Sequence, residues 1–288
     1  MNVASATTEY ADPTSCFQDV NVSIPRNNMH LEASDIQKII EDAIIEHRFQ
    51  VYYQPIYSLS GNRFVSAEAL IRLPTEEYGF IPPDIFIPIA EQTGIIDPIG
   101  DFVIEHVFQF MASEEYKRLG LQYMEINLST TQCMVATLAD RVIQLMNKYH
   151  ISPKEVNFEL TETASNFSQK ILEQNLKRLS EQGVGFSLDD YGTGYSNIKR
   201  MLQFPLKIVK LDKLFADGLA DEKLCLVLKS TVRMIKDINM EIVVEGIEDS
   251  KAFRLFKELG CDHVQGFYFC KPLPQERFVN FIECFNAI

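Results

Sequence analysis

Short apolar segments alternate with helix-like segments along most of the chain, and this alternation is what most restricts the fold. Apolar runs that favour strands begin at residues 123, 155, 185, 207, 241 and 263. Stretches with helical periodicity lie between them, at 131–149, 166–182, 222–236 and 250–259. Each apolar run is nearly continuous until its last one or two residues, which is typical of parallel strands covered by helices. The pattern predicts an α/β fold around a parallel sheet.

The beginning of this pattern differs, because a tight turn joins the first two predicted strands. Residues 50–57 and 63–73 both favour strand, and Ser60-Gly61-Asn62 between them is typical of a turn. We therefore expect the first strand to run antiparallel to the second. Eight strands with alternating helices favour a closed (β/α)8 barrel of the TIM type, here with its first strand antiparallel. An open doubly wound sheet is the alternative, because periodicity alone cannot report closure.

Residues 1–32 differ from residues 33–288 in composition and periodicity. The first segment is rich in Ser, Thr, Asn and Pro without sustained periodicity, so we expect a flexible N-terminal extension. Ser34 precedes an amphipathic stripe of Ile and Ala residues, and we expect it to cap the first helix. No linker interrupts the sequence after it, so residues 33–288 are expected to form one domain.

The charge and the apolar pattern exclude several classes of protein. The net charge of −13 argues against a protein that binds nucleic-acid polymers or membrane surfaces, since both require clustered Lys and Arg. No apolar run approaches the length of a membrane-spanning helix, and the first residues lack the features of a secretory signal. The six cysteines form no Cys-x-x-Cys pair, so free thiols are expected. A cytoplasmic protein is the resulting prediction.

Polar residues stand at or near the end of seven successive predicted strands. They are Glu68, Asn127, Glu159, Asp189 with Asp190, Lys210, Glu245 and Gln265. In a barrel such residues converge on one mouth, where active sites lie. Any one of them could be a helix cap, but several crowded carboxylates repel one another unless cations neutralise them. Oxygen donors from Glu, Asp and Asn suit Mg²⁺, Mn²⁺ or Ca²⁺, so a divalent metal site is predicted.

A pair of such cations suits attack on a phosphodiester, because one activates water and both stabilise the attacking and leaving oxygens. Lys210 among the acids would position the water or the phosphate, or offset charge in the transition state. A Schiff-base role for Lys210 is disfavoured, because neighbouring carboxylates raise the pKa of a lysine. The five His residues form no ligand pair, which disfavours a phosphodiesterase of the His-Asp class.

Eight short motifs occur in the order found in the EAL-domain phosphodiesterases. They are YQPI (53–56), EALIR (68–72), INLS (126–129), ELTE (159–162), DDYGTGYS (189–196), KLD (210–212), EGIE (245–248) and QGF (265–267). One motif alone would be weak, whereas the whole set in order is specific. From about residue 34 to the C-terminus the chain therefore resembles this family. The resemblance implies hydrolysis of the bacterial second messenger cyclic di-GMP to linear pGpG, with two Mg²⁺ or Mn²⁺ ions.

The resemblance also implies a role for each matching residue. The implied metal ligands are Glu68, Asn127, Glu159 and Asp189 for one ion, with Asp190 and Glu245 for the second ion and the water. The implied catalytic residues are Glu68, Lys210 and Glu245, and whether Glu245 is a base or only a ligand stays open. The implied substrate-binding residues are Gln54, Leu70, Arg72, Asp190 and Gln265. Glu162 matches the acid that anchors the mobile loop 189–196, and this loop implies a homodimer.

One departure from the family bears on activity. Lys207 stands where the family has Asp ahead of the KLD motif, and we expect it to place a positive charge near the site and to alter turnover. The alternative function is a catalytically silent member that holds cyclic di-GMP, or a protein partner, without cleaving it. Such receptors have typically lost one or more ligand acids, and here none is missing, which favours the enzyme.

Overall fold

The computed structural model describes residues 31–160, 169–193 and 197–286. The predicted extension at 1–32 therefore lies, except for its last two residues, outside the described residues. The first helix, α1 (Ala33–Ile45), begins one residue before Ser34, so the predicted cap is wrong. Glu32 is the N-cap instead. Its backbone is extended, and its N–H donates a hydrogen bond of 3.1 Å to the side chain of Asp35.

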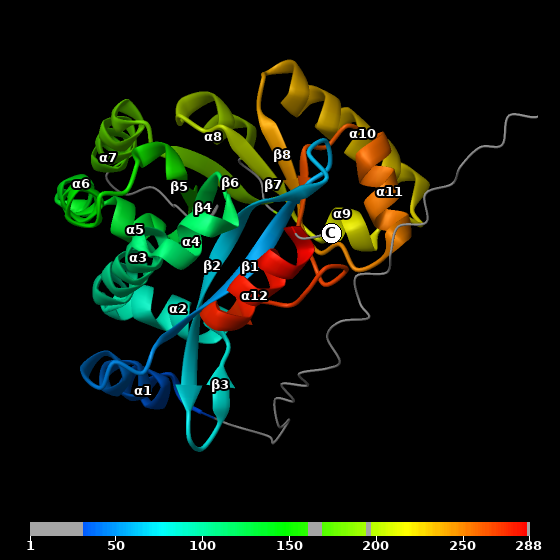
Figure 1. Cartoon of the computed structure of the whole chain (residues 1–288). Coiled ribbons are helices and arrows are strands. Elements are labelled where there is room, and N and C mark those ends of the chain that lie inside the picture. The colour runs from blue at the N-terminus through cyan, green and yellow to red at the C-terminus, as the bar shows by residue number, and fades with distance from the viewer. Residues whose placement is uncertain (1–30, 161–168, 194–196, 287–288) are drawn as a thin grey trace, which may run out of the picture.

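Eight strands close into a barrel (Figure 1). They are β1 (Gln50–Ser58), β2 (Arg63–Thr75), β4 (Tyr123–Leu128), β5 (Val156–Leu160), β6 (Gly185–Tyr191), β7 (Ile208–Leu211), β8 (Glu241–Val244) and β9 (His263–Val264). Neighbours pair in the order β1-β9-β8-β7-β6-β5-β4-β2, and β1 pairs with β2 to close the ring. β1 is antiparallel to both of its neighbours in the ring, and the other pairs are parallel. The predicted barrel with an antiparallel first strand is confirmed, and the open sheet is excluded.

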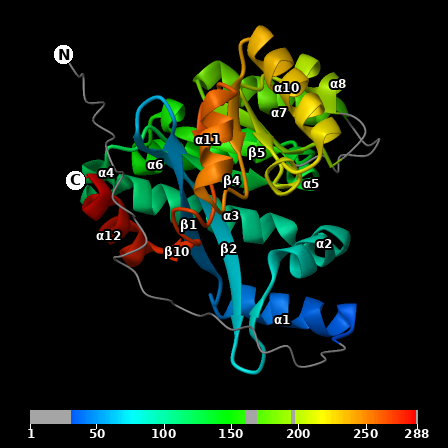
Figure 2. The ribbon, with the colours of Figure 1, turned by 90° about the vertical axis from the view of Figure 1, so that its right-hand side faces the viewer.

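Helices surround the ring of strands (Figures 1 and 2). The larger ones are α2 (Pro83–Thr93), α3 (Ile96–Ala112), α6 (Leu138–Tyr149), α7 (Gln169–Gln182), α10 (Glu222–Asp237) and α12 (Gln275–Asn286). The shorter ones are α4 (Glu114–Leu119), α5 (Thr130–Cys133), α8 (Asn197–Gln203), α9 (Leu214–Asp217) and α11 (Ser250–Glu258), with a 3₁₀ turn at Pro153–Glu155. The helix predicted at 131–149 is thus two helices, α5 and α6. No described helix combines the length and apolar character that crossing a membrane would require.

β2 continues past the barrel and carries a small lobe on one side of it (Figure 2). Its far end pairs with β3 (Gly79–Ile81), and α1 and α2 pack beside this hairpin. The lobe has a core of its own, in which Ile40, Leu73 and Phe86 are fully buried. A short strand β10 (Leu273–Pro274) pairs with β1 at Tyr52 and Tyr53, on the same edge of β1 that pairs with β9 at Tyr57 and Ser58.

The inside of the barrel is apolar at one end and polar at the other. Ile56, Ile208 and Val243 form a small buried cluster with Tyr123, and Tyr123 and Ile208 are the first residues of their strands. This cluster therefore closes the end where the parallel strands begin. The polar side chains lie toward the other end, where these strands finish.

Gly266 lets the chain after β9 wrap closely around the backbone that follows β8. Ile247 donates a hydrogen bond to the carbonyl of Gln265 and accepts one from Tyr268. A Cβ atom at Gly266 would lie 2.1 Å from the carbonyl oxygen of Ile247, a contact that cannot form. The absence of a side chain at Gly266 thus fixes the position of Gln265 at the polar end.

We predict that Gly266→Ala lowers the free energy of unfolding by about 1–3 kcal/mol, because the added methyl group forces backbone apart. Urea unfolding measures the change. The control is Gly61→Ala, where the nearest atom to the new Cβ is the Ser58 hydroxyl at 3.2 Å, which is a side-chain atom and can yield. Equal unfolding midpoints for the two variants would contradict the prediction.

Candidate active site

Lys210 on β7 lies at the centre of the polar end of the barrel. Its side chain is fully buried, and its Nζ donates to Glu159 at 2.8 and 2.9 Å and to Glu68 at 3.2 Å. A third carboxylate, that of Glu245, forms an ion pair of 2.8 Å with it. Burial alone lowers the pKa of Lys210, but attraction to these carboxylates outweighs it and holds the pKa well above its ordinary value. Lys210 is therefore a fixed cation and not a nucleophilic amine.

Glu68 is held from three sides. Asn127 donates to its Oε1 at 2.8 Å, while Gln265 and Lys210 donate to its Oε2 at 2.7 and 3.2 Å. Burial raises the pKa of Glu68, but the charge of Lys210 and the three hydrogen bonds together hold it below its usual value. Glu68 does not end its strand as predicted. It lies in the middle of β2, because this strand runs on beyond the barrel to pair with β3.

Two of the predicted substrate-binding residues, Gln54 and Gln265, belong to the hydrogen-bond network of Glu68: Gln265 contacts it directly, and Gln54 contacts Gln265. The Nε2 group of Gln265 also donates to Gln54 Oε1 at 3.0 Å, and Gln54 Nε2 donates to the carbonyl of Cys270 at 3.2 Å. Both glutamine side chains are buried. The structure thus connects them to a metal-ligand candidate, while their contact with a substrate stays a prediction.

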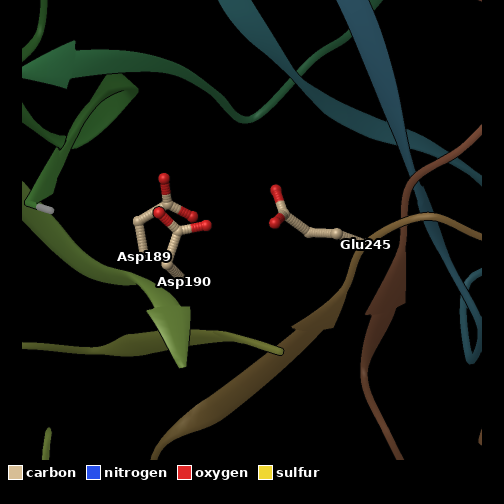
Figure 3. Close-up of side chains that lie close together, drawn as sticks. All are labelled: Asp189, Asp190 and Glu245. Atoms are coloured by element: carbon tan, nitrogen blue, oxygen red, sulfur yellow. The ribbon is translucent and has the colours of Figure 1, made fainter. Parts of the chain in front are cut away.

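Asp189 and Asp190 are neighbours in sequence, yet both carboxylates lie near Glu245 (Figure 3). In a regular strand they would point to opposite faces. Between Leu188 and Tyr191, three steps along β6 match only two along β7, so the strand contains a bulge. Asp190 has φ of +54°, a left-handed conformation that Asp tolerates better than most residues. Carboxylate oxygens of Asp189, Asp190 and Glu245 consequently lie within 4.8 Å of one another.

Burial raises the pKa of these three acids in the metal-free protein. The pKa of Glu245 is raised to about 8, because burial and repulsion by Asp189 and Glu68 outweigh attraction to Lys210. The pKa of Asp190 is raised to about 6 by burial and then by Asp189 and Asp212. The pKa of Asp189 is also raised, chiefly by burial. The site therefore holds more negative charge than Lys210 alone can compensate.

The residues at the site fit a hard divalent cation. Every candidate ligand offers an oxygen atom, which is the donor that Mg²⁺ and Mn²⁺ prefer over nitrogen or sulfur. The Oδ1 atom of Asp189 is buried and has no hydrogen-bond partner, so it has an unused lone pair inside the site. The three oxygens around Asp189, Asp190 and Glu245 are close enough to share one ion. Glu68, Glu159 and Asn127 bring further oxygens from the adjoining strands.

A cavity of about 580 Å³ opens beside these acids, a size typical of small-molecule sites. The predicted site residues that line it are Glu68, Leu70, Arg72, Asn127, Asp189 and Asp190, and α2 and α3 form the opposite wall. Leu70 and Arg72 follow Glu68 at alternate positions of β2, so all three point toward one face of the strand. The Arg72 guanidinium lies 5.5 Å from the Tyr52 ring centroid and donates to the Ile71 carbonyl.

One acid of the site, Glu125, was not predicted. It lies on β4, is fully buried, and its Oε2 is 3.7 Å from Lys210 Nζ. The alternation along a strand could have found it, because Glu125 precedes Asn127 by two residues and therefore faces the same interior. The motif comparison passed over it, since the INLS motif begins one residue later.

Two other predictions have different outcomes. Glu162 lies in 161–168, outside the described residues, so its role as loop anchor stays a prediction. The expectation that Lys207 places charge near the site is wrong. Lys207 precedes the first residue of β7 and lies at the opposite end of the barrel, where its charge acts on Glu241 at the start of β8.

Comparison with known proteins identifies the family. The sequence profile of the EAL domain matches residues 37–272. The chain belongs to the EAL domain family. It is 33% identical over 245 residues to the "Probable cyclic di-GMP phosphodiesterase PdeB" of Escherichia coli, and this match covers 85% of the chain and 46% of PdeB. It is 32% identical over 237 residues to "Cyclic di-GMP phosphodiesterase RocR" of Pseudomonas aeruginosa, covering 81% of the chain and 59% of RocR.

Other EAL proteins are similar in sequence or in structure. The "Signaling protein YkoW" of Bacillus subtilis is 34% identical over 251 residues, covering 85% of the chain and 31% of YkoW, so the chain spans about a third of that relative. The solved structure "PaMucR Phosphodiesterase, c-di-GMP complex" superposes with a TM-score of 0.78 at 29% identity, covering 84% of this chain and 99% of that one. The EAL enzyme Bd1971, bound to cAMP and cyclic di-GMP, superposes with a TM-score of 0.81 at 26% identity, covering 88% and 70%.

We predict that the apparent affinity for Mn²⁺ rises by about tenfold or more between pH 6 and pH 8, because metal binding must displace protons from raised carboxyls. The two groups that set this window are Asp190, with a pKa of about 6, and Glu245, with a pKa of about 8. Isothermal titration calorimetry in buffers of different ionisation enthalpy measures both the affinity and the protons released.

The metal-free protein supplies the control for this prediction. The pKa of Glu245 is raised by folding from 4.5 to about 8, so its contribution to stability is present below pH 4.5 and is lost as the pH rises through about 8. Metal-free stability and metal affinity should therefore change with pH in opposite directions over this window. Metal binding that releases no protons at pH 7 would contradict the assignment of these carboxyls.

Proposed function

We propose that this chain is a phosphodiesterase that opens cyclic di-GMP to linear pGpG with two Mg²⁺ or Mn²⁺ ions. One observation carries the proposal above the others. Four of the six ligand candidates, Glu68, Glu159, Asp189 and Glu245, have a carboxylate oxygen within 4 Å of the ammonium of one buried lysine, beside a cavity of about 580 Å³. The names of PdeB and RocR support the substrate, since both are described as acting on cyclic di-GMP.

The substrate side of the proposal rests on the walls of the cavity. Arg72 offers a planar cation that can pair with a phosphate group, and Leu70 offers an apolar contact beside it. Asp190, which lies on β6, also lines this cavity and can accept hydrogen bonds from a base or sugar. Gln265 would act through its hydrogen bond to Glu68, and Gln54 through its hydrogen bond to Gln265.

In the proposed reaction a water oxygen attacks phosphorus and the bond from phosphorus to the 3′ oxygen breaks. The products are a 5′-phosphate and a 3′-hydroxyl, and the proton lost by the water is balanced by one gained at the 3′ oxygen. Bound divalent ions would lower the pKa of the water and stabilise charge on the attacking and leaving oxygens. Lys210 and Glu245, whose charged atoms lie 2.8 Å apart, are placed to orient the water as donor and acceptor. Lys210 is fully buried, and its ion pairs with Glu159 and Glu245 hold its ammonium group in the site.

The competing function is a receptor that holds cyclic di-GMP without cleaving it. The EAL domain of FimX from Pseudomonas aeruginosa, which has been solved bound to c-di-GMP, superposes with a TM-score of 0.76, but at 19% identity the likeness concerns the fold alone. The acids around Lys210 separate the two functions, because a receptor has no need to keep all of them. Their presence together supports cleavage. A cytoplasmic location stays a prediction, as does the absence of a nucleic-acid polymer or membrane partner.

We predict that the protein converts cyclic di-GMP to pGpG with Mg²⁺ or Mn²⁺, and that Glu68→Ala lowers the rate by at least about 100-fold, because a ligand and the hydrogen-bond acceptor of Asn127 and Lys210 are lost. Chromatography of the products measures turnover. Glu115→Ala, an exposed acid on α4, is the matched control and should keep the wild-type rate. If the protein binds cyclic di-GMP but forms no product with either metal, the proposed phosphodiesterase activity is refuted and the receptor function is favoured.

We also propose that the chain forms a homodimer. Apolar side chains are exposed on three consecutive helices that follow the loop 189–196, and the most exposed are Ile198, Leu202, Leu226 and Val227. Leu202 on α8 is 73% exposed and Leu226 on α10 is 65% exposed. Large apolar side chains exposed together on neighbouring segments are typical of surfaces that another protein covers. A second copy of the chain is the partner that the family resemblance favours.

We predict that the double variant Leu202→Lys, Leu226→Lys shifts the protein from dimer to monomer, because two charges cannot be buried in an apolar contact. Size-exclusion chromatography with light scattering measures the mass. Ile45→Lys is the control, since Ile45 on α1 is 75% exposed and lies outside these helices. A wild-type chain that is monomeric at all concentrations up to about 100 µM would rule the homodimer out.

A further inference from the structure

Glu125 is a buried carboxylate to which the proposed function gives no task. Its side chain is fully buried on β4, and its Oε2 receives no N–H donor; a hydrogen bond to the Glu159 carboxyl forms only when one of the two acids is protonated. Its Oε1 accepts a long bond of 3.5 Å from Asn157, whose amide makes a much shorter bond of 2.8 Å to Ser187. A buried acid that is so poorly satisfied is costly to keep in a folded protein. Such a group calls for a partner in some state of the protein.

The nearest cation to Glu125 is Lys210, with 3.7 Å between Oε2 and Nζ. This is beyond a hydrogen bond but within ion-pair distance. Lys210 has three N–H donors. In the metal-free protein Glu68, Glu159 and Glu245 receive them, at 3.2, 2.8 and 2.8 Å. Glu125 is therefore next to a lysine whose donors are already occupied.

The three acids that occupy Lys210 are the same acids that would hold divalent cations. An ammonium group and a divalent cation that share these oxygens repel each other, so ion binding weakens the contacts of Lys210. The attacking water of the proposed reaction can accept one N–H of Lys210, but the other contacts need an acceptor from the protein, because the side chain of Lys210 is fully buried. Among the carboxyl groups within 4.0 Å of its Nζ in the described residues, Glu125 is the one that is not an implied metal ligand.

The position of Glu125 suits it to accept this lysine. It lies two residues before Asn127 on the same interior face of β4, and so one step deeper in the barrel than Asn127, in register with Glu68 on β2. A movement of less than about 1 Å would bring its Oε2 within hydrogen-bond distance of Lys210. Glu125 would then hold Lys210 while Glu68, Glu159 and Glu245 bind the ions.

We propose that Glu125 is the counter-ion of Lys210 in the metal-loaded protein, and that it raises the affinity of the site for divalent cations. The inference rests on the proposed two-metal site and adds to it a positioning residue. Glu125 releases the ligand oxygens from Lys210 and offsets the repulsion between Lys210 and the ions. Groups that orient metal ligands from behind typically contribute 10- to 100-fold to metal affinity.

The test is Mn²⁺ binding by Glu125→Gln, which keeps the shape of the side chain and removes its charge. Isothermal titration calorimetry of the full chain at pH 8, without nucleotide, should give a dissociation constant at least about 10-fold weaker than wild type. Glu115→Gln makes the same chemical change on an exposed acid of α4 and should bind as wild type does. Glu125→Asp, which keeps the charge with a shorter reach, should fall between wild type and Glu125→Gln.

Thermal unfolding separates this role from a merely structural one. The metal-free Glu125→Gln protein should be at least as stable as wild type, because the neutral amide can donate to the Glu159 carboxylate without adding charge to the site, while the stabilisation produced by Mn²⁺ should shrink. A variant that is less stable without metal but binds Mn²⁺ like wild type would show a structural role and overturn the proposal. Should Glu125→Gln fail to fold, Glu125→Ser, which is neutral and leaves room for water, replaces it with the same expectations.

The wild-type titration distinguishes failure of this inference from failure of the proposed function. A wild-type chain that binds no Mn²⁺ has no two-metal site, and the inference falls with it. A wild-type chain that binds Mn²⁺ and a Glu125→Gln variant with the same dissociation constant refute the role of Glu125 alone.

Discussion

The buried ammonium group of Lys210 is the interaction on which the polar interior of this barrel depends. Removing a charge from water costs several kcal/mol, and only close, well-oriented opposite charges can offset that cost. Carboxylates from β2, β5 and the end of β8 do so directly, and those of β4 and β6 lie within 4 Å. The strands that supply them are therefore held in register by electrostatics at one end and by apolar packing at the other.

The positive charge of Lys210 does not balance the negative charge of the carboxylates around it, and this excess explains why the site can bind cations. One ammonium faces five carboxyl groups, and burial raises the pKa of most of them. Without metal, protons must neutralise part of the excess. Divalent ions replace those protons with charge of the same sign, so they stabilise an arrangement that the fold already imposes.

The sequence was sufficient for the fold and for most of the acids that meet at one end of the barrel, because both depend on regular periodicity, whereas the roles of Gln54, Leu70 and Arg72 came only from the family resemblance. The strands that contain Asn127, Glu159 and Lys210 were found from apolar runs, and their number favoured a closed barrel without excluding an open sheet. What could not be predicted depends on irregular backbone. The bulge that turns Asp189 and Asp190 to the same side leaves no trace in the apolar pattern. The second strand was predicted to run on to residue 73, but the pattern does not show that its far half leaves the barrel and pairs with β3, so Glu68 was counted among the strand ends. Lys207 was misplaced because its distance from Lys210 was counted in sequence, whereas three steps along a strand span the depth of the barrel.

The continuous strand β2 has one more consequence. Glu68, Leu70 and Arg72 stand on a single unbroken stretch of backbone, paired with β1 along its length, so no loop or hinge separates the ligand from the arginine. At about 3.3 Å per residue, their backbone positions are spaced along roughly 13 Å. The strand therefore fixes the spacing between the metal-ligand candidate Glu68 and the phosphate-binding candidate Arg72. A molecule that contacts both Glu68 and Arg72 must place its two contacting groups at a matching spacing, because a paired strand does not change its length.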